Sequence, residues 1–356
     1  MNVIKCNPDI KPEEQLTGDM NNSIFLAGPC PRENYEDDWR NEAVEILEKI
    51  GFTGKIINPT NDKFAELREK YKDEALAVQT KWEYIAMKKA SAIVFWVARD
   101  IKGNHPAFTT NIEFGDWFDK PGVYCGFPDW AEKNEYLKCR LDMKKIKYWD
   151  NLEELLKHVV KKLNPSKSDM FFTADTHFSM QRTLELSRRP FLNLFEMDLE
   201  MISNWNKTVT MNDIVYHAGD FGDVSTIKSI LTDLNYKQLI LVMGNHDRDH
   251  ETEINNIVST IKNRHIDVVS RATFEYNKKK YYVIHEPDEG KTHPRFPDSV
   301  VLFGHIHGRG FGKKNGFDIG TDYHNYTPVP MEKIEWFANI ALPHWDHNVF
   351  SEKASV

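Results

Sequence analysis

The chain has 356 residues, of which 40% are hydrophobic and 28% charged, with a formal net charge of −8. This length exceeds what one hydrophobic core usually supports, so we expect two domains. The negative charge argues against a long, sequence-independent grip on a nucleic-acid backbone, because such binding needs a basic face. Small phosphorylated ligands are compatible with it.

Cysteine usage and hydropathy indicate the compartment. The four cysteines, Cys6, Cys30, Cys125 and Cys139, form no CxxC pair and are too sparse for a disulfide scaffold. The first residues lack the apolar segment of a secretory signal, and no apolar stretch approaches the length of a membrane span. We therefore expect a soluble, cytoplasmic protein without a membrane partner.

The N-terminal half alternates apolar runs with amphipathic segments. Residues 1–22 are polar, contain two prolines and predict an arm, or an edge strand at best. Strands are expected at 23–27, 55–58, 91–97 and 123–127, and helices at 39–50, 78–90, 111–117 and 152–163. Asp37 or Asp38 can cap the first helix, and Gly51 can end it. This alternation predicts an α/β domain over residues 23–163, with a doubly wound parallel sheet.

A linker composition marks residues 164–168, and a second domain is expected over 169–356. Its predicted strands begin at Met170 and cover 213–217, 238–243, a hairpin over 273–285 turned at Asn277, and 299–303. Each strand is followed by residues of metal-ligand type, namely Asp175, His177, Asp220, Asn245, His285, His305 and His307.

The positions of these seven residues predict a metal site. Side chains that follow parallel strands meet in a crevice outside the sheet, so we expect all seven at one sheet edge. A spacing of two along an extended chain would put Asp175 with His177, and His305 with His307, on the same face. Because one carboxylate can span two ions about 3.5–4 Å apart in such sites, Asp220 is the candidate bridge.

The ordered motifs DTH, GDFGD, GNHD, IHEP and GHIH resemble the calcineurin-like metallophosphoesterase family over residues 168 to about 340. The resemblance implies an α/β/β/α sandwich and two divalent metal ions, drawn from manganese, iron, zinc or nickel. By this resemblance one ion would be held by Asp175, His177, Asp220 and His307, and the other by Asp220, Asn245, His285 and His305.

The same resemblance implies roles for nearby residues. His246 would lie unligated beside the scissile phosphate as a proton donor or charge stabiliser, with Asp247 orienting its imidazole. The motif SRRPF at 187–191, with Trp205, resembles a bacterial and phage subgroup in which Arg182 or Arg189 could bind phosphate. Both arginines are also compatible with ordinary surface or helix-entry positions.

The N-terminal motifs FLAGPCPR, WRNEA, INPTND, KWEYIAMKKASAIVFWV and TTNIEFG resemble the nucleoside 2-deoxyribosyltransferase-like family over about residues 22–163. The resemblance implies that Glu113 attacks the anomeric carbon of a nucleoside and forms a covalent glycosyl intermediate. Gly28 and Pro29 would let the backbone approach the sugar closely.

This N-terminal pattern is incomplete. The family has an Asp six residues before the nucleophile, where this chain has Ala107, and Asp100 could substitute for it. Glu83 is a second acid nearby, equally compatible with a solvated or capping role. The alternative for Glu113 is a helix N-terminal acid that only favours the helix dipole.

Three functions follow from these patterns. The first is a bifunctional enzyme of nucleotide breakdown or salvage, which cleaves or transfers an N-glycosidic bond and hydrolyses a phosphoester of a small nucleoside-type substrate. In the second, the N-terminal domain senses a nucleotide or ADP-ribose-like ligand and gates a phosphodiesterase or nuclease. The third function is that of a nuclease acting on DNA or RNA. Only small basic clusters support it, namely Lys278–Lys280 and Lys313 with Lys314. A homo-oligomer formed through the N-terminal domain is compatible with each.

Overall fold

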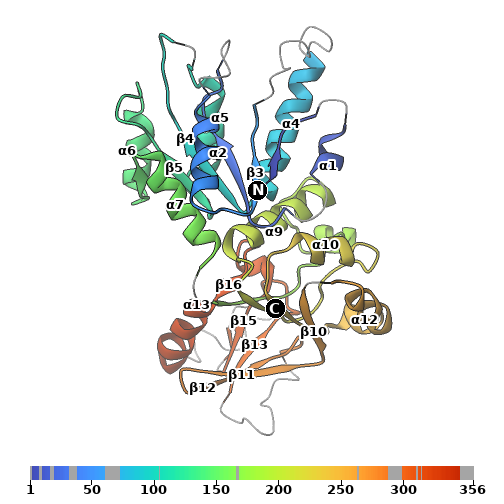
Figure 1. Cartoon of the computed structure of the whole chain (residues 1–356). Helices are drawn as coiled ribbons and strands as arrows, with labels where there is room; N and C mark the ends of the chain where they lie inside the picture. The colour runs from blue at the N-terminus through green and yellow to red at the C-terminus, as the bar shows by residue number, and fades with distance from the viewer. Residues whose placement is uncertain are drawn as a thin grey trace. The chain divides into compact units, whose positions relative to one another are not determined.

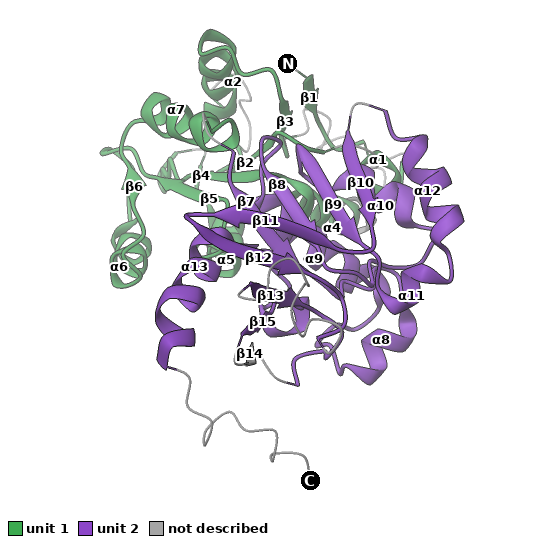
Figure 2. Ribbon diagram, turned by 90° about the horizontal axis from the view of Figure 1, so that it is seen from below, with its two compact units in different colours: residues 1–165 green, residues 166–356 purple. Residues whose placement is uncertain are grey.

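The structure is a computed structural model that describes residues 2–7, 10–16, 20–31, 38–60, 73–103, 105–165, 168–262, 264–287, 299–309, 312–313 and 315–344. Outside these ranges lie several positions discussed above: Asp37, the last two residues of INPTND, residues 166–167 of the linker, Lys314, parts of the N-terminal arm, and residues 345–356. The chain divides into two compact units, residues 1–165 and 166–356, which Figure 2 colours separately. Within the described ranges, no helix has the length and apolar character needed to cross a membrane.

Unit 1 contains a six-stranded sheet in the order β1-β3-β2-β4-β5-β6, with every neighbouring pair parallel. Figure 1 labels its strands β3, β4 and β5. Its strands are β1 (Asn2–Ile4), β2 (Ser23–Ala27), β3 (Lys55–Ile57), β4 (Ala92–Trp96), β5 (Val123–Gly126) and β6 (Tyr148–Trp149). Its described helices are α1 (Pro12–Gln15), α2 (Trp39–Lys49), α4 (Asp73–Lys89), α5 (Phe108–Trp117), α6 (Glu135–Met143) and α7 (Leu152–Leu163). The predicted doubly wound parallel sheet is confirmed.

Helices pack on both faces of this sheet because successive strand side chains point in opposite directions. Val94 and Trp96 of β4 belong to the core cluster formed with α2 and α7. Phe95, between them, packs edge-on against Phe114 of α5, with ring centroids 5.6 Å apart. The direction in which strands are added reverses between β2 and β4, and ligands of such sheets bind outside the carboxyl ends of the strands at this reversal.

The ends of two helices bear on the sequence predictions. Asp38 accepts a hydrogen bond from the Arg40 N–H and caps α2, and Gly51, with φ +76°, follows the helix as expected. Helix α5 begins at Phe108 rather than at residue 111. Glu113 therefore lies within the helix, beyond the first turn in which the helix dipole favours an acid. The interpretation of Glu113 as a helix N-terminal acid is wrong.

Unit 2 is built on two five-stranded sheets, in the orders β10-β9-β8-β7-β16 and β11-β12-β13-β15-β14. The first comprises β7 (Met170–Thr173), β8 (Ile214–His217), β9 (Gln238–Val242), β10 (His265–Val269) and β16 (Val329–Pro330), and the second β11 (Ala272–Tyr276), β12 (Lys279–Val283), β13 (Val300–Phe303), β14 (Gly312–Lys313) and β15 (Gly316–Asp318). Its described α-helices are α8 (Gln181–Leu186), α9 (Leu194–Thr208), α10 (Ile227–Asp233), α11 (Asn245–Arg248), α12 (Glu251–Ser259) and α13 (Met331–Trp336).

The two sheets pack face to face around a shared core. Phe172 of β7 faces inward and belongs to one cluster with Val283 of β12 and Leu302 of β13. Its neighbour Phe171 faces outward, into a cluster with Trp205 of α9 and residues of α10. Strands that bury both faces are expected to read as continuous apolar runs, as these do. The architecture confirms the expected mixed α/β domain with sandwiched sheets.

Candidate metal centre

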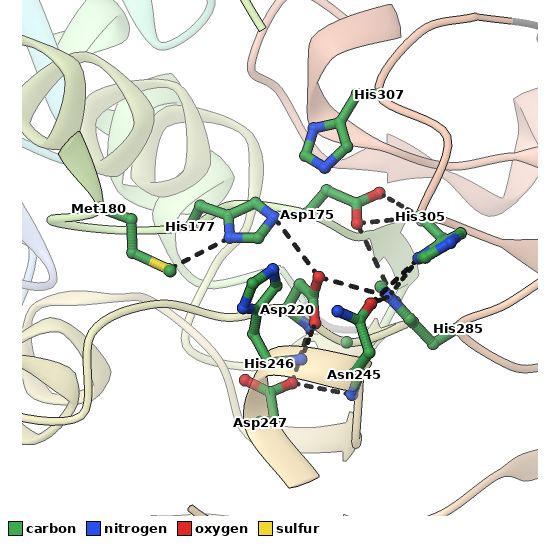
Figure 3. A network of polar contacts seen from close by, with 12 residues as sticks. Asp175, His177, Met180, Asp220, Asn245, His246, Asp247, His285, His305 and His307 are labelled. Carbon is green, nitrogen blue, oxygen red and sulfur yellow. Dashed lines mark hydrogen bonds and ion pairs between the residues drawn. The ribbon is translucent and has the colours of Figure 1, made fainter. Parts of the chain in front are cut away.

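The seven ligand-type side chains follow five strands that belong to two different sheets. In the first sheet, Asp175 and His177 follow β7, Asp220 follows β8, and Asn245, the first residue of α11, follows β9. In the second sheet, His285 follows β12, and His305 and His307 follow β13. Figure 3 shows these side chains gathered around Asp220. The expectation that all seven lie at one sheet edge is therefore wrong, because packing of the two sheets brings the ends of both to the same place.

The backbone at these ligands is not extended. Asp175, His177, Asp220, His305 and His307 all have φ between +46° and +73°, in the left-handed region. The predicted reason for their pairing, a spacing of two along an extended chain, is therefore wrong. Non-glycine residues in strained backbone regions cost on the order of 1–3 kcal/mol each, so surrounding contacts must hold these loops in place.

Asp175, His177 and His307 form one group, with ligand atoms within 4.8 Å of one another. The His177 Nδ1 lies 3.2 Å from the Met180 sulfur, which favours a proton on that nitrogen. The His177 Nε2 is buried, has no hydrogen-bond partner among the described residues and lies 3.5 Å from Asp220 Oδ2. Burial lowers the pKa of His177 to about 3, so its Nε2 carries a free lone pair at neutral pH.

Asp220, Asn245, His285 and His305 form a second group. The His285 Nδ1–H donates to the Ala218 carbonyl at 2.8 Å, which turns Nε2 toward the site. Around that Nε2 lie Asn245 Oδ1 at 2.9 Å, His305 Nδ1 at 3.2 Å and Asp220 Oδ2 at 3.4 Å. Several lone pairs thus converge on one point, where they require either a proton or a cation.

The two groups share buried carboxylates. Asp175, Asp220 and His285 also have ligand atoms within 4.8 Å of one another. Burial opposes ionisation of Asp220, but the hydrogen bond and the charge of His285 hold the pKa of Asp220 below its usual range. Burial raises the pKa of Asp175 to about 6, so it is mostly ionised at neutral pH. Carboxylate, imidazole and amide oxygen together form a donor set that suits divalent transition metals.

Glycines let the loops approach this closely. A Cβ at Gly244 would lie 2.1 Å from Asp220 Oδ1, and a Cβ at Gly304 would lie 2.5 Å from Asp175 Oδ2. Gly219 has φ +94°, and a Cβ there would meet Gly244 and the His285 ring. The unpartnered His177 nitrogen and this close-packed cradle both fit a bound cation.

His246 and Asp247 differ in their relation to the site. The His246 ring packs edge-on against His177, with centroids 5.4 Å apart, and no described residue hydrogen-bonds its ring nitrogens. Asp247 does not orient that ring, contrary to the prediction. Its carboxylate accepts hydrogen bonds from the N–H groups of Asp220 at 2.7 Å, Gly244 at 2.9 Å and Phe221 at 3.1 Å, because the start of α11 turns it back toward the loop after β8.

The two arginines expected near phosphate also differ. Arg182 is exposed on α8. Arg189 is 4% exposed, and its guanidinium donates to the Asp322 carboxylate and to the carbonyls of Asp175 and Thr176. Those donors are occupied inside the protein, so the prediction that Arg189 binds phosphate is corrected to a role within the fold.

Two residues beside the site were missed from the sequence. The His307 Nδ1 lies 3.1 Å from Asp322 Oδ2 and 3.1 Å from Ser187 Oγ. Burial opposes ionisation of Asp322, but hydrogen bonds with His307 and Arg189 hold the pKa of Asp322 below its ordinary value. The only local signal for Asp322 is that it is an aspartate shortly after β15. This position does not distinguish Asp322 from other acidic residues in loops.

In unit 1, Glu113 and Glu83 interact electrostatically. Burial, together with the negative charge of Glu83, raises the pKa of Glu113 to about 8, while Arg40 opposes the shift. Burial also raises the pKa of Glu83, whose carboxylate accepts a hydrogen bond from Gln79 at 2.8 Å. Two partly buried acids near a single cation are typical of functional sites more than of solvated surfaces.

The loop after β2 is held by an arginine that sequence reasoning did not single out. Arg40 is fully buried and donates to the carbonyls of Leu26, Gly28 and Pro29. A Cβ at Gly28 would lie 2.4 Å from the Trp96 carbonyl oxygen, so glycine is needed there for the approach of β2 to β4. The expected role of Gly28 and Pro29 toward a sugar stays a prediction.

The proposed substitute acid, Asp100, has a local role. Its carboxylate accepts hydrogen bonds from the N–H groups of Gly103 at 2.8 Å and Lys102 at 3.2 Å, which fixes a turn. Ala107 precedes α5 with φ +59° and is buried.

The Gly244 contact provides a direct test of the metal centre. We expect Gly244→Ala to displace the Asp220 carboxylate and to weaken Mn²⁺ binding by more than about 10-fold, the lower end of the loss seen when residues around metal ligands are changed. Isothermal titration of the chelator-treated protein with Mn²⁺ measures this. Gly115→Ala is the control, because a Cβ at Gly115 meets no atom within 4 Å. Equal affinities in the two variants would contradict the expectation.

Comparisons with known proteins agree with both halves of the chain. Residues 21–128 match the family model described as nucleoside 2-deoxyribosyltransferase like, and residues 170–320 match the calcineurin-like phosphoesterase superfamily domain. An uncharacterised protein of Methanocaldococcus jannaschii is 29% identical over 180 residues, covering 48% of this chain and 90% of that protein. A solved structure of a protein of unknown function from Aquifex aeolicus aligns with a TM-score of 0.36 and 22% identity, covering 48% of this chain and 98% of its own. The chain therefore carries, in the predicted order, a nucleoside 2-deoxyribosyltransferase-like domain followed by a calcineurin-like phosphoesterase domain.

Proposed function

We propose that the C-terminal domain hydrolyses phosphate esters of small nucleoside-type substrates, with two bound divalent metal ions. The observation that carries the proposal is the position of Asp220 Oδ2, which lies 3.5 Å from His177 Nε2 and 3.4 Å from His285 Nε2. A carboxylate oxygen between two imidazole nitrogens suits a bridge between two cations.

Each residue has a role in this proposal. One ion would be held by Asp175, His177, Asp220 and His307, and the other by Asp220, Asn245, His285 and His305. When bound, such ions supply Lewis acidity toward phosphoryl oxygens and favour ionisation of water. His246 would donate a proton to the leaving oxygen, since no described residue occupies its ring nitrogens. Asp247 would hold the loops after β8 and β9 together.

We further propose that the N-terminal domain cleaves or transfers an N-glycosidic bond, with Glu113 as the nucleophile. A Glu113 carboxylate oxygen would form a bond to the anomeric carbon while the carbon–nitrogen bond breaks, and the base would leave with that electron pair and take up a proton. Water, or an acceptor base, would then displace Glu113 from the sugar. The Glu113 and Glu83 pair supports this reading, because two acids can divide nucleophilic and proton-transfer roles.

A second candidate function rests on Asp100 and Ala107. Asp100 is bound within its own turn, and Ala107 occupies the position of the family's sugar-binding acid. This favours a domain that binds a nucleotide or ADP-ribose-like ligand without turnover and regulates the phosphoesterase. Calorimetry that detects tight binding of such a ligand, with no release of free base, would favour it over catalysis.

The phosphoesterase proposal predicts a strong effect of Asp220→Asn. In the Mn²⁺-loaded protein we expect phosphate release from the best of a panel of phosphomonoesters, phosphodiesters and cyclic nucleotides to fall by more than about 100-fold, beyond the loss typical of residues that only support ligands. Asp267→Asn, a partly exposed acid on β10, is the control and should retain activity. Undiminished phosphate release from Asp220→Asn would overturn the two-metal reading.

Metal affinity should depend on pH through His285. Burial alone would lower its pKa, but the hydrogen bond with Asp220 and the charge of Asp175 raise the pKa of His285 to about 9 in the metal-free protein. The ring is therefore protonated at pH 7, and a metal must displace that proton. We expect Mn²⁺ affinity to rise from pH 6 to 8, by up to about tenfold per pH unit for one displaced proton. Titrations in buffers of different ionisation enthalpy count the proton, and a pH-independent affinity would exclude this linkage.

The glycosidic proposal predicts both a mutant effect and a pH profile. Glu113→Gln should lower release of free base by roughly 100-fold or more, as loss of a positioned catalytic group does. Because the pKa of Glu113 is about 8 and a nucleophile must be ionised, base release should rise with pH up to about 8 and then level off. Asp116→Asn, an exposed acid on the same helix, is the control. A rate that falls over this pH range would instead make Glu113 a proton donor.

A further inference from the structure

Arg189 contacts the loop that carries two of the candidate ligands. Its guanidinium donates to the carbonyl of Asp175 at 2.6 Å and to that of Thr176 at 2.7 Å. This segment includes the left-handed residues Asp175 and His177, with φ +55° and +46°. Two hydrogen bonds from one planar, buried group restrict the loop more tightly than a lysine could, because the guanidinium presents its donors in a fixed fork.

The same guanidinium also hydrogen-bonds both carboxylate oxygens of Asp322. The Arg189 Nε donates to Asp322 Oδ1 at 2.8 Å, and one terminal nitrogen donates to Oδ2 at 3.1 Å. Asp322 Oδ2 in turn lies 3.1 Å from His307 Nδ1, which also lies 3.1 Å from Ser187 Oγ. A carboxylate that accepts the Nδ1–H of a histidine fixes its tautomer and directs Nε2 toward a metal.

These contacts connect one half of the metal centre and bypass the other. Through Arg189 and Asp322 the network reaches His307 and the carbonyls of Asp175 and Thr176, the two residues that precede His177. Asp175, His177 and His307 form one group of ligand atoms. In the described part of the chain, neither Arg189 nor Asp322 hydrogen-bonds Asn245, His285 or His305. The second half has its own support in the hydrogen bond from His285 to the Ala218 carbonyl.

We infer that Arg189 and Asp322 are positioning residues that assemble the Asp175, His177 and His307 half of the metal centre. The inference rests on the proposed two-metal function. The buried ion pair joins a loop of the first sheet to a loop of the second, although its two residues lie 133 positions apart. Its loss should therefore weaken one ion and spare the other.

The test compares Mn²⁺ binding in the wild-type chain and in four variants, of which Ser187→Ala is described below. Arg189→Lys keeps the charge but loses the fork, and Asp322→Asn removes the charge that holds His307. We expect each to weaken one of two Mn²⁺ sites by about 10–100-fold, the usual effect of a residue that supports a metal ligand. Arg264→Lys is the matched control, because Arg264 also donates to two backbone carbonyls, those of Leu234 and Thr232, and neither residue lies next to a candidate ligand in the sequence.

Two measurements separate positioning from general stability. Isothermal titration gives the number and affinity of the Mn²⁺ sites, and electron paramagnetic resonance distinguishes a coupled pair of ions from an isolated one. When two equivalents of Mn²⁺ are added per chain, enough to fill the tighter site and supply one further ion, the wild type should show a coupled pair of ions. Arg189→Lys and Asp322→Asn should each show an isolated ion. Melting in a chelator checks that each variant folds. Ser187→Ala leaves the ion pair intact and should weaken the same site by only a few-fold, so the inference stays testable if a charge variant does not fold.

The outcomes distinguish the positioning role of Arg189 and Asp322 from the two-metal function on which it rests. A wild-type chain that binds fewer than two Mn²⁺ ions defeats the proposed two-metal function itself. Two wild-type sites that both persist unchanged in Arg189→Lys and Asp322→Asn defeat only the positioning role. Equal weakening of both sites, or the same loss in Arg264→Lys, also defeats it, because a structural defect would then account for the effect.

Discussion

Mutual repulsion among buried ligand groups is the constraint on which the C-terminal domain depends. Asp175 and Asp220 are carboxylates in a nearly solvent-free site, and the neutral His177 ring directs a lone pair at Asp220. Such groups are costly to bury together unless a cation or proton lies between them. Backbone N–H groups offset part of the repulsion, since His305 donates to Asp175 and His246 to Asp220. The remaining electrostatic demand matches a bound metal.

Acids outside the ligand set hold the chain that carries it. Asp247 binds three backbone N–H groups at the ends of β8 and β9, and Asp322 joins Arg189 to His307. Asp247 is buried, and the Asp322 side chain is 8% exposed. The left-handed φ angles of Asp175, His177 and Asp220 therefore have a physical explanation, because Arg189 and Asp247 bind the backbone of the loops that carry them.

The N-terminal domain also places carboxyl groups in a partly buried site, but among the described residues they belong to no group of potential metal ligands. Its two acids, Glu83 and Glu113, are partly buried, and burial raises the pKa of both; the negative charge of Glu83 raises the pKa of Glu113 further. Arg40, the nearby cation, is occupied by backbone carbonyls of the β2 loop and by Asp38. A ligand that carries developing positive charge, as a glycosyl transition state does, would favour the ionised form of Glu113.

Much of this protein follows from sequence alone. Apolar runs predicted β2, β4, β9 and β13 closely, and the ligand types after the strands predicted a metal site, because side-chain periodicity and strand-ending turns are local properties. Helix α5 begins earlier than predicted. Its N-cap residue is Ala107, which makes no side-chain capping hydrogen bond, so the sequence carries no capping signal for a start at Phe108.

Only the tertiary structure decided which contacts each of these polar side chains makes. It placed the seven ligands in loops of two sheets, turned Asp247 toward backbone N–H groups, and buried Arg189 against Asp322. Each of these outcomes depends on partners far apart in the chain, such as Asp247 with Asp220 across 27 positions and Arg189 with Asp322 across 133. A local pattern identifies a residue's chemistry, but its partners follow from how the sheets pack, and those partners determine whether an aspartate binds a metal, a histidine or the backbone.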